Sequence, residues 1–186
     1  MGIDPNNKPL SLLGRGPCLD ALRGALGRAV AGVRILATVV GTAGSGVTTL
    51  LDVFAAEVRE QGQEVRRAEA FEAQRSDPGH IAEDLGIGGR PSDRFSVLIV
   101  DGAQWADATS IAMLREMLSG SGAGGVLVVM GRRPFPGREV SALAEMEKVT
   151  AQRGALVTVE IAPLSTDDLA SIAPPDLAGS LIAATG

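Results

Sequence analysis

The segment "VVGTAGSGVTTLLD", residues 39–52, constrains the fold of this chain more than any other stretch. An apolar run ends at Gly41, a turn rich in glycine follows, and apolar residues then recur at helical spacing until Gly62. A buried strand, a glycine turn and a helix in this order form the first half of a unit that joins two parallel strands. The segment therefore predicts an α/β fold in which helices cover both faces of a parallel sheet.

Other apolar runs supply the remaining strands of this sheet. The parallel strands are predicted at residues 35–40, 95–100, 126–130 and 155–161, with a weaker candidate in "EVRRAEA", residues 64–70. Stretches of helical periodicity separate them at residues 17–32, 47–62, 81–85, 107–120 and 138–154. Two short helices are expected after Pro163, the first capped by Ser165 or Thr166.

The composition is that of a soluble globular domain, and it excludes several classes of function. The 186 residues carry a formal net charge of −5, so this segment is not expected to bind nucleic acid directly. Cys18 is the only cysteine, which excludes an internal disulfide and a cysteine metal cluster and suits the cytoplasm. No apolar stretch is long enough to cross a membrane. We expect residues 1–9 to be a tag or a disordered leader and residues 10–186 to form a single domain.

The glycine turn comes close to the phosphate-binding pattern G-x-x-x-x-G-K-[ST]. Gly41, Gly46 and Thr48 fall in register, while Val47 occupies the position of the lysine. The backbone N–H groups of such a loop and the N-terminus of the following helix attract anions even without the lysine. The residues predicted to bind a nucleotide here are Gly41, Thr42, Ala43, Gly44, Ser45, Gly46, Val47, Thr48 and Thr49. The alternative is a tight connection between a strand and a helix that binds no ligand.

A second motif, "VLIVDGAQWAD", places Asp101 directly after an apolar strand. A carboxylate at that point is typical of a Walker B strand, which holds Mg²⁺ through a water molecule next to the hydroxyl group of the phosphate loop. The metal site predicted from the two motifs consists of Thr48 and Asp101, both at the carboxyl edge of the sheet. Apolar strands that end in aspartate are also common in proteins without a metal.

Four segments together resemble the signal-transduction P-loop ATPases of the STAND class, and in particular the ATPase domain of large LuxR-type bacterial transcription regulators. They are "LLGRGPCLDALRGAL", "DGAQWADATSIAMLREM", "VLVVMGRRP" and "IAPLSTDDLASI", and the resemblance extends over residues 12–186. It implies a three-layer P-loop NTPase fold of the AAA/STAND type with a parallel five-stranded sheet, in which strand 126–130 lies between the strands of the two motifs. It also implies that Arg15 lies near the nucleotide base, that Arg133 senses the γ-phosphate, and that the helical lid is truncated.

Two departures from that family limit the function that we expect. Val47 replaces the lysine, whose charge-assisted hydrogen bond is worth about 1.5 to 3 kcal/mol, so nucleotide binding should be weakened without being abolished. Gly102 replaces the second acid of the Walker B motif, so we expect little or no hydrolysis unless an acid is restored there. The leading hypothesis is a degenerate regulatory domain that binds ATP or ADP with Mg²⁺ and has other domains of the parent regulator as partners.

Two alternatives to this hypothesis stay open. The chain is a nucleotide-free P-loop scaffold that acts as a protein-interaction module, or it is an active ATPase that uses a surrogate cation, with Arg132 or Arg133 as the first candidates. The same two arginines form a basic cluster with Arg138 that is either ordinary surface or part of the site.

Other polar residues have structural interpretations. Asp107 is predicted to be the N-cap of a helix rather than a catalytic base, and Trp105 is predicted to be a packing anchor. His80 is predicted to be a solvated residue of a polar loop. Cys18 is expected to be a small core or helix-end residue, because nothing near it in the sequence suggests an activated thiolate.

Overall fold

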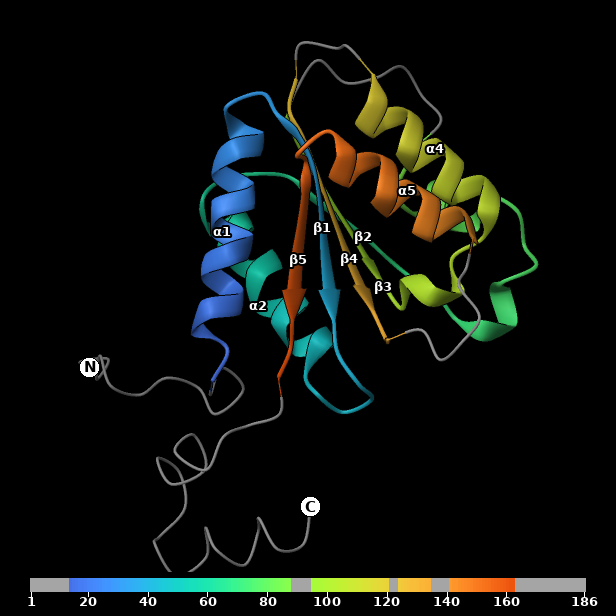
Figure 1. Cartoon of the computed structure of the whole chain (residues 1–186), viewed down its shortest axis with the longest axis horizontal. Helices are drawn as coiled ribbons and strands as arrows, with labels where there is room; N and C mark the ends of the chain where they lie inside the picture. Colours follow the sequence, from blue (N-terminus) through green and yellow to red (C-terminus); the bar gives the residue numbers. More distant parts are fainter. Residues whose placement is uncertain (1–13, 88–94, 121–123, 135–140, 163–186) are drawn as a thin grey trace, which may run out of the picture.

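A computed structural model of the chain describes residues 14–87, 95–120, 124–134 and 141–162. Its centre is a five-stranded sheet with the order β2-β3-β4-β1-β5, in which every neighbouring pair of strands is parallel (Figure 1). The strands are β1 (Arg34–Val40), β2 (Val65–Glu69), β3 (Ser96–Asp101), β4 (Val126–Arg132) and β5 (Leu156–Glu160). The predicted parallel sheet is confirmed, and β4 lies between the strands of the two motifs as expected.

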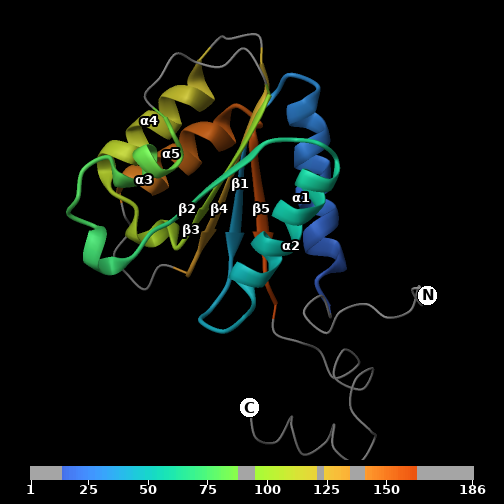
Figure 2. The same cartoon turned by 180° about the vertical axis from the view of Figure 1, so that it is seen from behind.

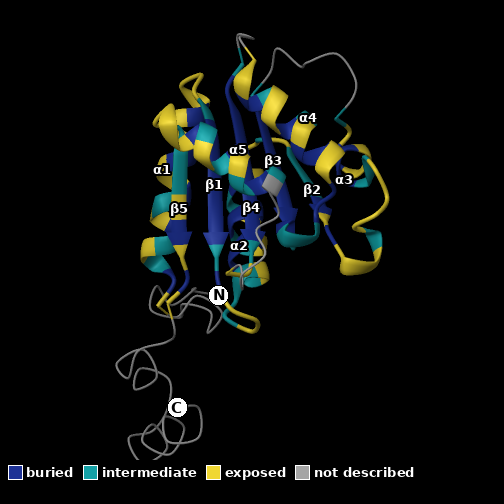
Figure 3. Cartoon of the chain, turned by 45° about the vertical axis from the view of Figure 1, so that its right-hand side comes forward, coloured by how far each residue is buried: buried dark blue, intermediate teal, exposed yellow. Residues whose placement is uncertain are grey.

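The three central strands β1, β3 and β4 are buried along nearly their whole length, as Figure 3 shows. Ile35, Ala37 and Val39 of β1 join the hydrophobic cluster on one face of the sheet, and Leu36 joins the cluster on the other face. Successive side chains of a strand point to opposite faces, so an uninterrupted apolar strand requires cover on both sides. The edge strand β2 is only partly buried, which explains the weak strand signal of "EVRRAEA".

Helices provide this cover on both faces, which Figures 1 and 2 show from opposite sides. One face carries α1 (Gly16–Val30) and α2 (Val47–Glu60). The other face carries α3 (His80–Asp84), α4 (Ala108–Ser119) and α5 (Ser141–Gln152). Two single-turn 3₁₀ helices, η2 (Glu72–Gln74) and η3 (Ala103–Trp105), lie in the connections after β2 and β3. Within the described residues, the helices are all too short or too polar to cross a membrane.

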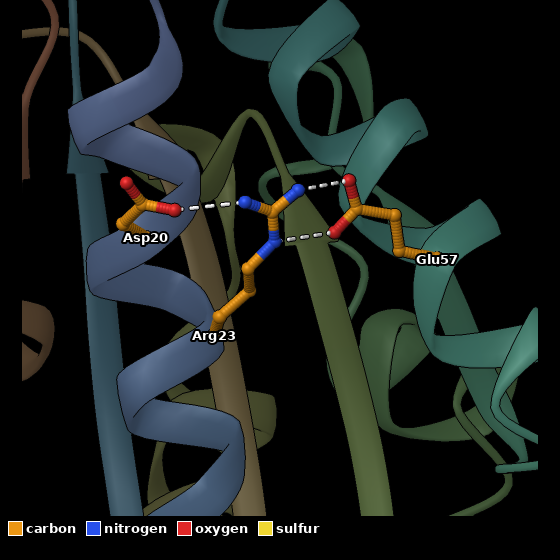
Figure 4. Close-up of polar contacts among 3 residues, drawn as sticks. All are labelled: Asp20, Arg23 and Glu57. Atoms are coloured by element: carbon orange, nitrogen blue, oxygen red, sulfur yellow. Dashed lines mark hydrogen bonds and ion pairs between the residues drawn. The ribbon is translucent and has the colours of Figure 1, made fainter. Parts of the chain in front are cut away.

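Arg23 links α1 to α2 at the surface (Figure 4). Its Nε and Nη2 donate to the two carboxylate oxygens of Glu57 at 2.9 and 2.6 Å, and its Nη1 donates to Asp20 at 2.8 Å. The Arg23 side chain is 48% exposed, so solvent screens these ion pairs and limits their contribution to about 1 kcal/mol or less. The apolar packing of the two helices against the sheet therefore contributes most of their stability.

Several predictions concern residues outside the described ranges. These are the two short helices after Pro163, the position of Arg138 and the helical lid. The domain limits at residues 1–9 and 10–186 also stay predictions.

Candidate nucleotide-binding site

The connections that follow β1, β2, β3 and β4 meet at the carboxyl edge of the sheet and line a pocket of about 470 Å³. Ligands of open α/β sheets bind at this edge, and pockets of roughly 300 to 1,000 Å³ hold small molecules. Both predicted metal-binding residues, Thr48 and Asp101, line this pocket. The described residues that line it lie in segments 41–44, 46–49, 69–72, 101–102, 104–105 and 131–133.

The glycine turn after β1 has a backbone that only glycine adopts readily. Gly44 and Gly46 have φ angles of 78° and 93°, in the left-handed region, and Gly46 is the N-cap of α2. A Cβ atom added at Gly41 would lie 2.2 Å from Ser45 Oγ and 2.8 Å from Val47 Cγ2, so the loop closes tightly on that glycine. Gly46 offers no side chain to the first N–H groups of α2, which leaves the positive end of the helix available to an anion at the pocket.

Val47 is turned toward the interior of the protein as well as toward the pocket. It packs against the hydrophobic cluster on the α1 and α2 face, and its Cγ1 would lie 2.7 Å from a Cβ atom added at Gly131 of β4. The same added atom would lie 3.2 Å from Asp101 Oδ1, so β4 passes closely beside both motifs. The position of the lysine therefore contributes an apolar side chain that packs against the core.

Asp101 is engaged by protein groups through both of its carboxylate oxygens. Oδ1 accepts a hydrogen bond from the backbone N–H of Gly102 at 2.9 Å, and Oδ2 pairs with Nη2 of Arg67 at 3.1 Å. Arg67, on β2, also pairs through Nη1 with Asp52 on α2. Sequence reasoning missed Arg67, because its contact with Asp101 depends on the pairing of β2 with β3. The glycine turn has the backbone that a phosphate group requires, whereas a Mg²⁺ ion at Asp101 would compete with Arg67 for the charge of the carboxylate.

Gly102 has a steric reason to be glycine. Its φ angle is 70°, and a Cβ atom added there would lie 2.4 Å from the carbonyl oxygen of Ala70. Ala70 is held in place because its N–H donates to the carbonyl oxygen of Asp101 at 2.8 Å. The second acid of a Walker B motif therefore does not fit at this position unless the turn moves, so restoring an acid there carries a cost that the sequence did not reveal.

The three arginines predicted near the site have different surroundings. Arg15 is buried and donates to the carbonyl oxygens of Ser45 at 2.8 Å and Ala162 at 2.7 Å, so it supports the loop from outside, and it is not among the described residues that line the pocket. Arg132 lines the pocket and forms an ion pair with Glu147 at 2.9 Å. Arg133 also lines the pocket and has an exposed side chain.

Asp107 is the N-cap of α4, as predicted. Its Oδ1 accepts hydrogen bonds from the backbone N–H groups of Ser110 and Gly79, both at 2.8 Å, and its side chain is 4% exposed. Burial alone would raise the pKa of Asp107, but the hydrogen bonds from Ser110 and Gly79 outweigh that effect and lower the pKa below its ordinary value. The carboxylate is thus a structural junction between α3 and α4.

The prediction that His80 is a solvated loop residue is wrong. His80 is the first residue of α3, and its side chain is only 14% exposed. Its Nδ1 lies 2.9 Å from the carbonyl oxygen of Asp77 and 3.3 Å from Oδ2 of Asp107. The burial arises because Asp107 fixes the backbone of Gly79, which starts α3 at His80.

Trp105 and Cys18 lie close to their predicted environments. Trp105 is partly buried, packs against the cluster on the α3, α4 and α5 face and lines the pocket. Cys18 lies near the start of α1 and packs against the cluster on the opposite face.

Comparison with known proteins relates the fold to solved structures. No family model and no curated protein matches this chain. A chain of the E. coli MS115-1 HORMA:CdnC:Trip13 complex matches with a TM-score of 0.60 and 14% identity, over 100% of this chain and 78% of that chain. A chain of Drosophila ORC bound to AT-rich DNA and Cdc6 matches with a TM-score of 0.58 and 13% identity, over 88% of this chain. The fold is a P-loop NTPase fold of the AAA+ type.

These similarities establish the fold and nothing finer, because the identities are low. The match covers only 32% of the Drosophila chain, so this chain spans about a third of that protein's length. The three-layer architecture and the five-stranded parallel sheet agree with this fold class.

Proposed function

We propose that this chain is a nucleotide-binding regulatory domain that holds ATP or ADP weakly and hydrolyses little or none of it. The observation that carries the proposal is the backbone of the turn between β1 and α2, with left-handed Gly44 and Gly46 opening the N-terminus of α2 to the pocket. Such a turn binds phosphate through N–H groups and the helix dipole, both of which survive the loss of the lysine.

The absence of efficient hydrolysis follows from two positions. Val47 brings no charge to the phosphates, and Gly102 leaves no acid to orient an attacking water. The contact between Gly102 and Ala70 strengthens the second argument, because an acid does not fit there in the present backbone. Catalysis of phosphoryl transfer depends on such positioned charges, whereas binding depends on them less.

The finer assignment rests on the sequence resemblance to the STAND-class ATPase domains of LuxR-type transcription regulators. In this proposal the domain acts in the cytoplasm and its partners are other domains of the parent regulator. The structural neighbours belong to assemblies, namely a HORMA:CdnC:Trip13 complex and ORC bound to DNA and Cdc6, which agrees with a role in protein contacts. The net charge of −5 argues that any DNA binding resides elsewhere.

A nucleotide-free interaction module is the second candidate, and one observation favours it. Phe71 lines the pocket and is 49% exposed, and the partly buried Trp105 belongs to the same lining. Exposed aromatic side chains are frequent at protein interfaces. This candidate predicts that the pocket binds no nucleotide.

A calorimetric titration of ATP and ADP separates the two candidates when it includes a matched pair of glycine variants. Gly46→Ala and Gly62→Ala each force alanine into a left-handed conformation, with φ of 93° and 77°, and neither added methyl meets an atom within 4 Å. They lie at opposite ends of α2, and only Gly46 lines the pocket. We expect Gly46→Ala to weaken nucleotide binding by about tenfold or more and Gly62→Ala to leave it unchanged. Failure of the wild-type domain to bind either nucleotide at millimolar concentration would favour the interaction module.

A further inference from the structure

Arg67 places a positive charge against the carboxylate that the Walker B motif offers to a metal ion. Its guanidinium pairs with Oδ2 of Asp101 at 3.1 Å, and the side chains of Arg67 and Asp101 are 25% and 9% exposed. The second partner of Arg67 is Asp52. Asp52 lies one helical turn beyond Thr48 on α2, so Arg67 bridges the two elements that carry the predicted metal-binding residues.

The charges around the pocket show why this contact matters. The described charged residues that line the pocket are Glu69, Glu72, Asp101, Arg132 and Arg133. Arg132 is paired with Glu147, and the position of the phosphate-loop lysine holds Val47. Three carboxylates thus face two arginines in this lining, and one of the arginines is paired, so offsetting the charge of Asp101 would reduce the repulsion of a phosphate group.

We propose that Arg67 takes the place of the metal ion at Asp101, so that nucleotide binding by this domain does not require Mg²⁺. The proposal rests on the proposed function, because it concerns the nucleotide bound in the same pocket. A guanidinium group stays charged at all physiological pH values and is weakly hydrated, whereas Mg²⁺ loses its water reluctantly. Arg67 shares its single charge between Asp101 and Asp52, so it offsets part of the negative charge of the carboxylate that Mg²⁺ would bind, while the N–H of Gly102 holds the other oxygen of Asp101.

The test compares the dissociation constant of ADP in EDTA with that in Mg²⁺, measured by calorimetry. For the wild-type domain the two values should agree within about threefold. Arg67→Gln exposes the charge of Asp101, so it should weaken binding in EDTA by about tenfold or more, and Mg²⁺ should restore the loss. Arg67→Lys keeps the charge but does not bridge Asp52 and Asp101 through two separate nitrogens, so its affinity in EDTA should lie between those of the wild type and Arg67→Gln. Asp101→Asn keeps the inference testable if the glutamine variant folds poorly.

Arg66→Gln is the matched control. Arg66 is the neighbour of Arg67 on β2, pairs with Glu64 at 3.0 Å and donates to the carbonyl oxygen of Leu85 at 3.2 Å. Neither arginine is among the described residues that line the pocket, but Arg67 pairs with the lining residue Asp101, whereas the partners of Arg66 lie outside the lining. Arg66→Gln changes the net charge equally and should leave binding insensitive to Mg²⁺. Thermal melting of each variant confirms that it is folded.

Asp101→Asn supplies a second readout that distinguishes a metal ligand from a partner of Arg67. If Arg67 replaces the metal, this variant should bind ADP in Mg²⁺ at least as tightly as the wild type, because it removes a negative charge from the pocket. A loss of about tenfold or more in Mg²⁺, or a wild-type domain that binds ADP only with Mg²⁺, would overturn the inference and leave the proposed function intact. A wild-type domain that binds ADP in neither buffer would overturn the proposed function together with this inference.

Discussion

The turn after β1 and the turn after β3 lie at the same edge of the sheet, but they use their polar groups differently. In the first, Gly44 and Gly46 shape a backbone that leaves the N-terminus of α2 open to the pocket. In the second, the polar groups bind one another: Asp107 accepts from Gly79 and Ser110, and the carbonyl oxygen of Asp101 accepts from the N–H of Ala70. An open turn suits a ligand, whereas a closed turn holds the elements of the protein together.

A side chain at position 102 should destabilise the closed turn more than the other changes proposed below. Gly102→Ala combines a left-handed conformation with a contact of 2.4 Å to the carbonyl oxygen of Ala70, so we expect a loss of about 2 to 5 kcal/mol in the free energy of unfolding. Gly102→Asp should lose at least as much and should not restore hydrolysis. Urea denaturation measures both losses.

Gly44→Ala is the control for this prediction, because it has a similar φ of 78° and open space around the added methyl. It should lose only about 1 to 2 kcal/mol, the cost of the backbone conformation. Equal losses for Gly44→Ala and Gly102→Ala would show that the contact with Ala70 relaxes freely.

Removing the cap of α4 tests the closed turn through its polar groups. Asp107→Ala leaves two backbone donors without their acceptor, so the free energy of unfolding should fall by about 2 to 4 kcal/mol. Asp107→Asn keeps an acceptor oxygen and should lose less than half as much. Nucleotide affinity should be unchanged in both variants while they remain folded, and a large loss of affinity would show that the two turns are coupled.

Because the pKa of Asp107 is lowered, the difference in stability between the wild type and Asp107→Asn should depend on pH. A carboxyl group whose pKa is lower in the folded state stabilises the protein above its unfolded pKa, and this contribution disappears as the pH falls through the folded value. The difference in stability between wild type and Asp107→Asn should therefore shrink below about pH 4. Urea denaturation at a series of pH values measures this change, and a difference that stays constant down to pH 2 would contradict it.

Restoring the missing positive charge at position 47 tests whether the open turn binds phosphate. Val47→Lys should tighten ATP and ADP binding by roughly 10- to 100-fold, the gain expected for about 1.5 to 3 kcal/mol, while phosphate release stays near background. Ala56→Lys adds the same charge on an exposed part of α2 away from the pocket and should have little effect. If calorimetry finds no gain for Val47→Lys in a folded domain, the loop does not bind phosphate.

Short stretches of sequence predicted most of this fold, because the signals for its central strands and its glycine turn lie within those stretches. The apolar runs of β1, β3 and β4 are unambiguous since both faces of these strands are buried, and the glycines after β1 indicate a left-handed backbone directly from the sequence. The placement of Thr48 and Asp101 at one edge followed from the parallel sheet alone.

The missed features all depend on residues far apart in the sequence. The ion pair of Arg67 with Asp101 requires the register in which Arg67 lies opposite Ile99. The burial of His80 requires Asp107, and the need for glycine at position 102 becomes visible only when Ala70 is in place. A sequence pattern identifies a residue missing from a motif, but the structure shows what occupies the space instead.

The strand order has a consequence for how the chain is made. β1 leads into the glycine turn of the candidate site, yet its two neighbours are β4 and β5: Arg34 pairs with Val126, and Leu36 pairs with Leu156. During synthesis on a ribosome, β1 therefore emerges long before either neighbour, and the backbone groups on both of its edges stay unpaired until β4 and β5 are made. Unpaired edges of this kind slow folding and favour association with other chains. Arg15 links the carbonyl oxygen of Ser45 in the turn to that of Ala162, so a turn that is made early is completed by a residue that is made late.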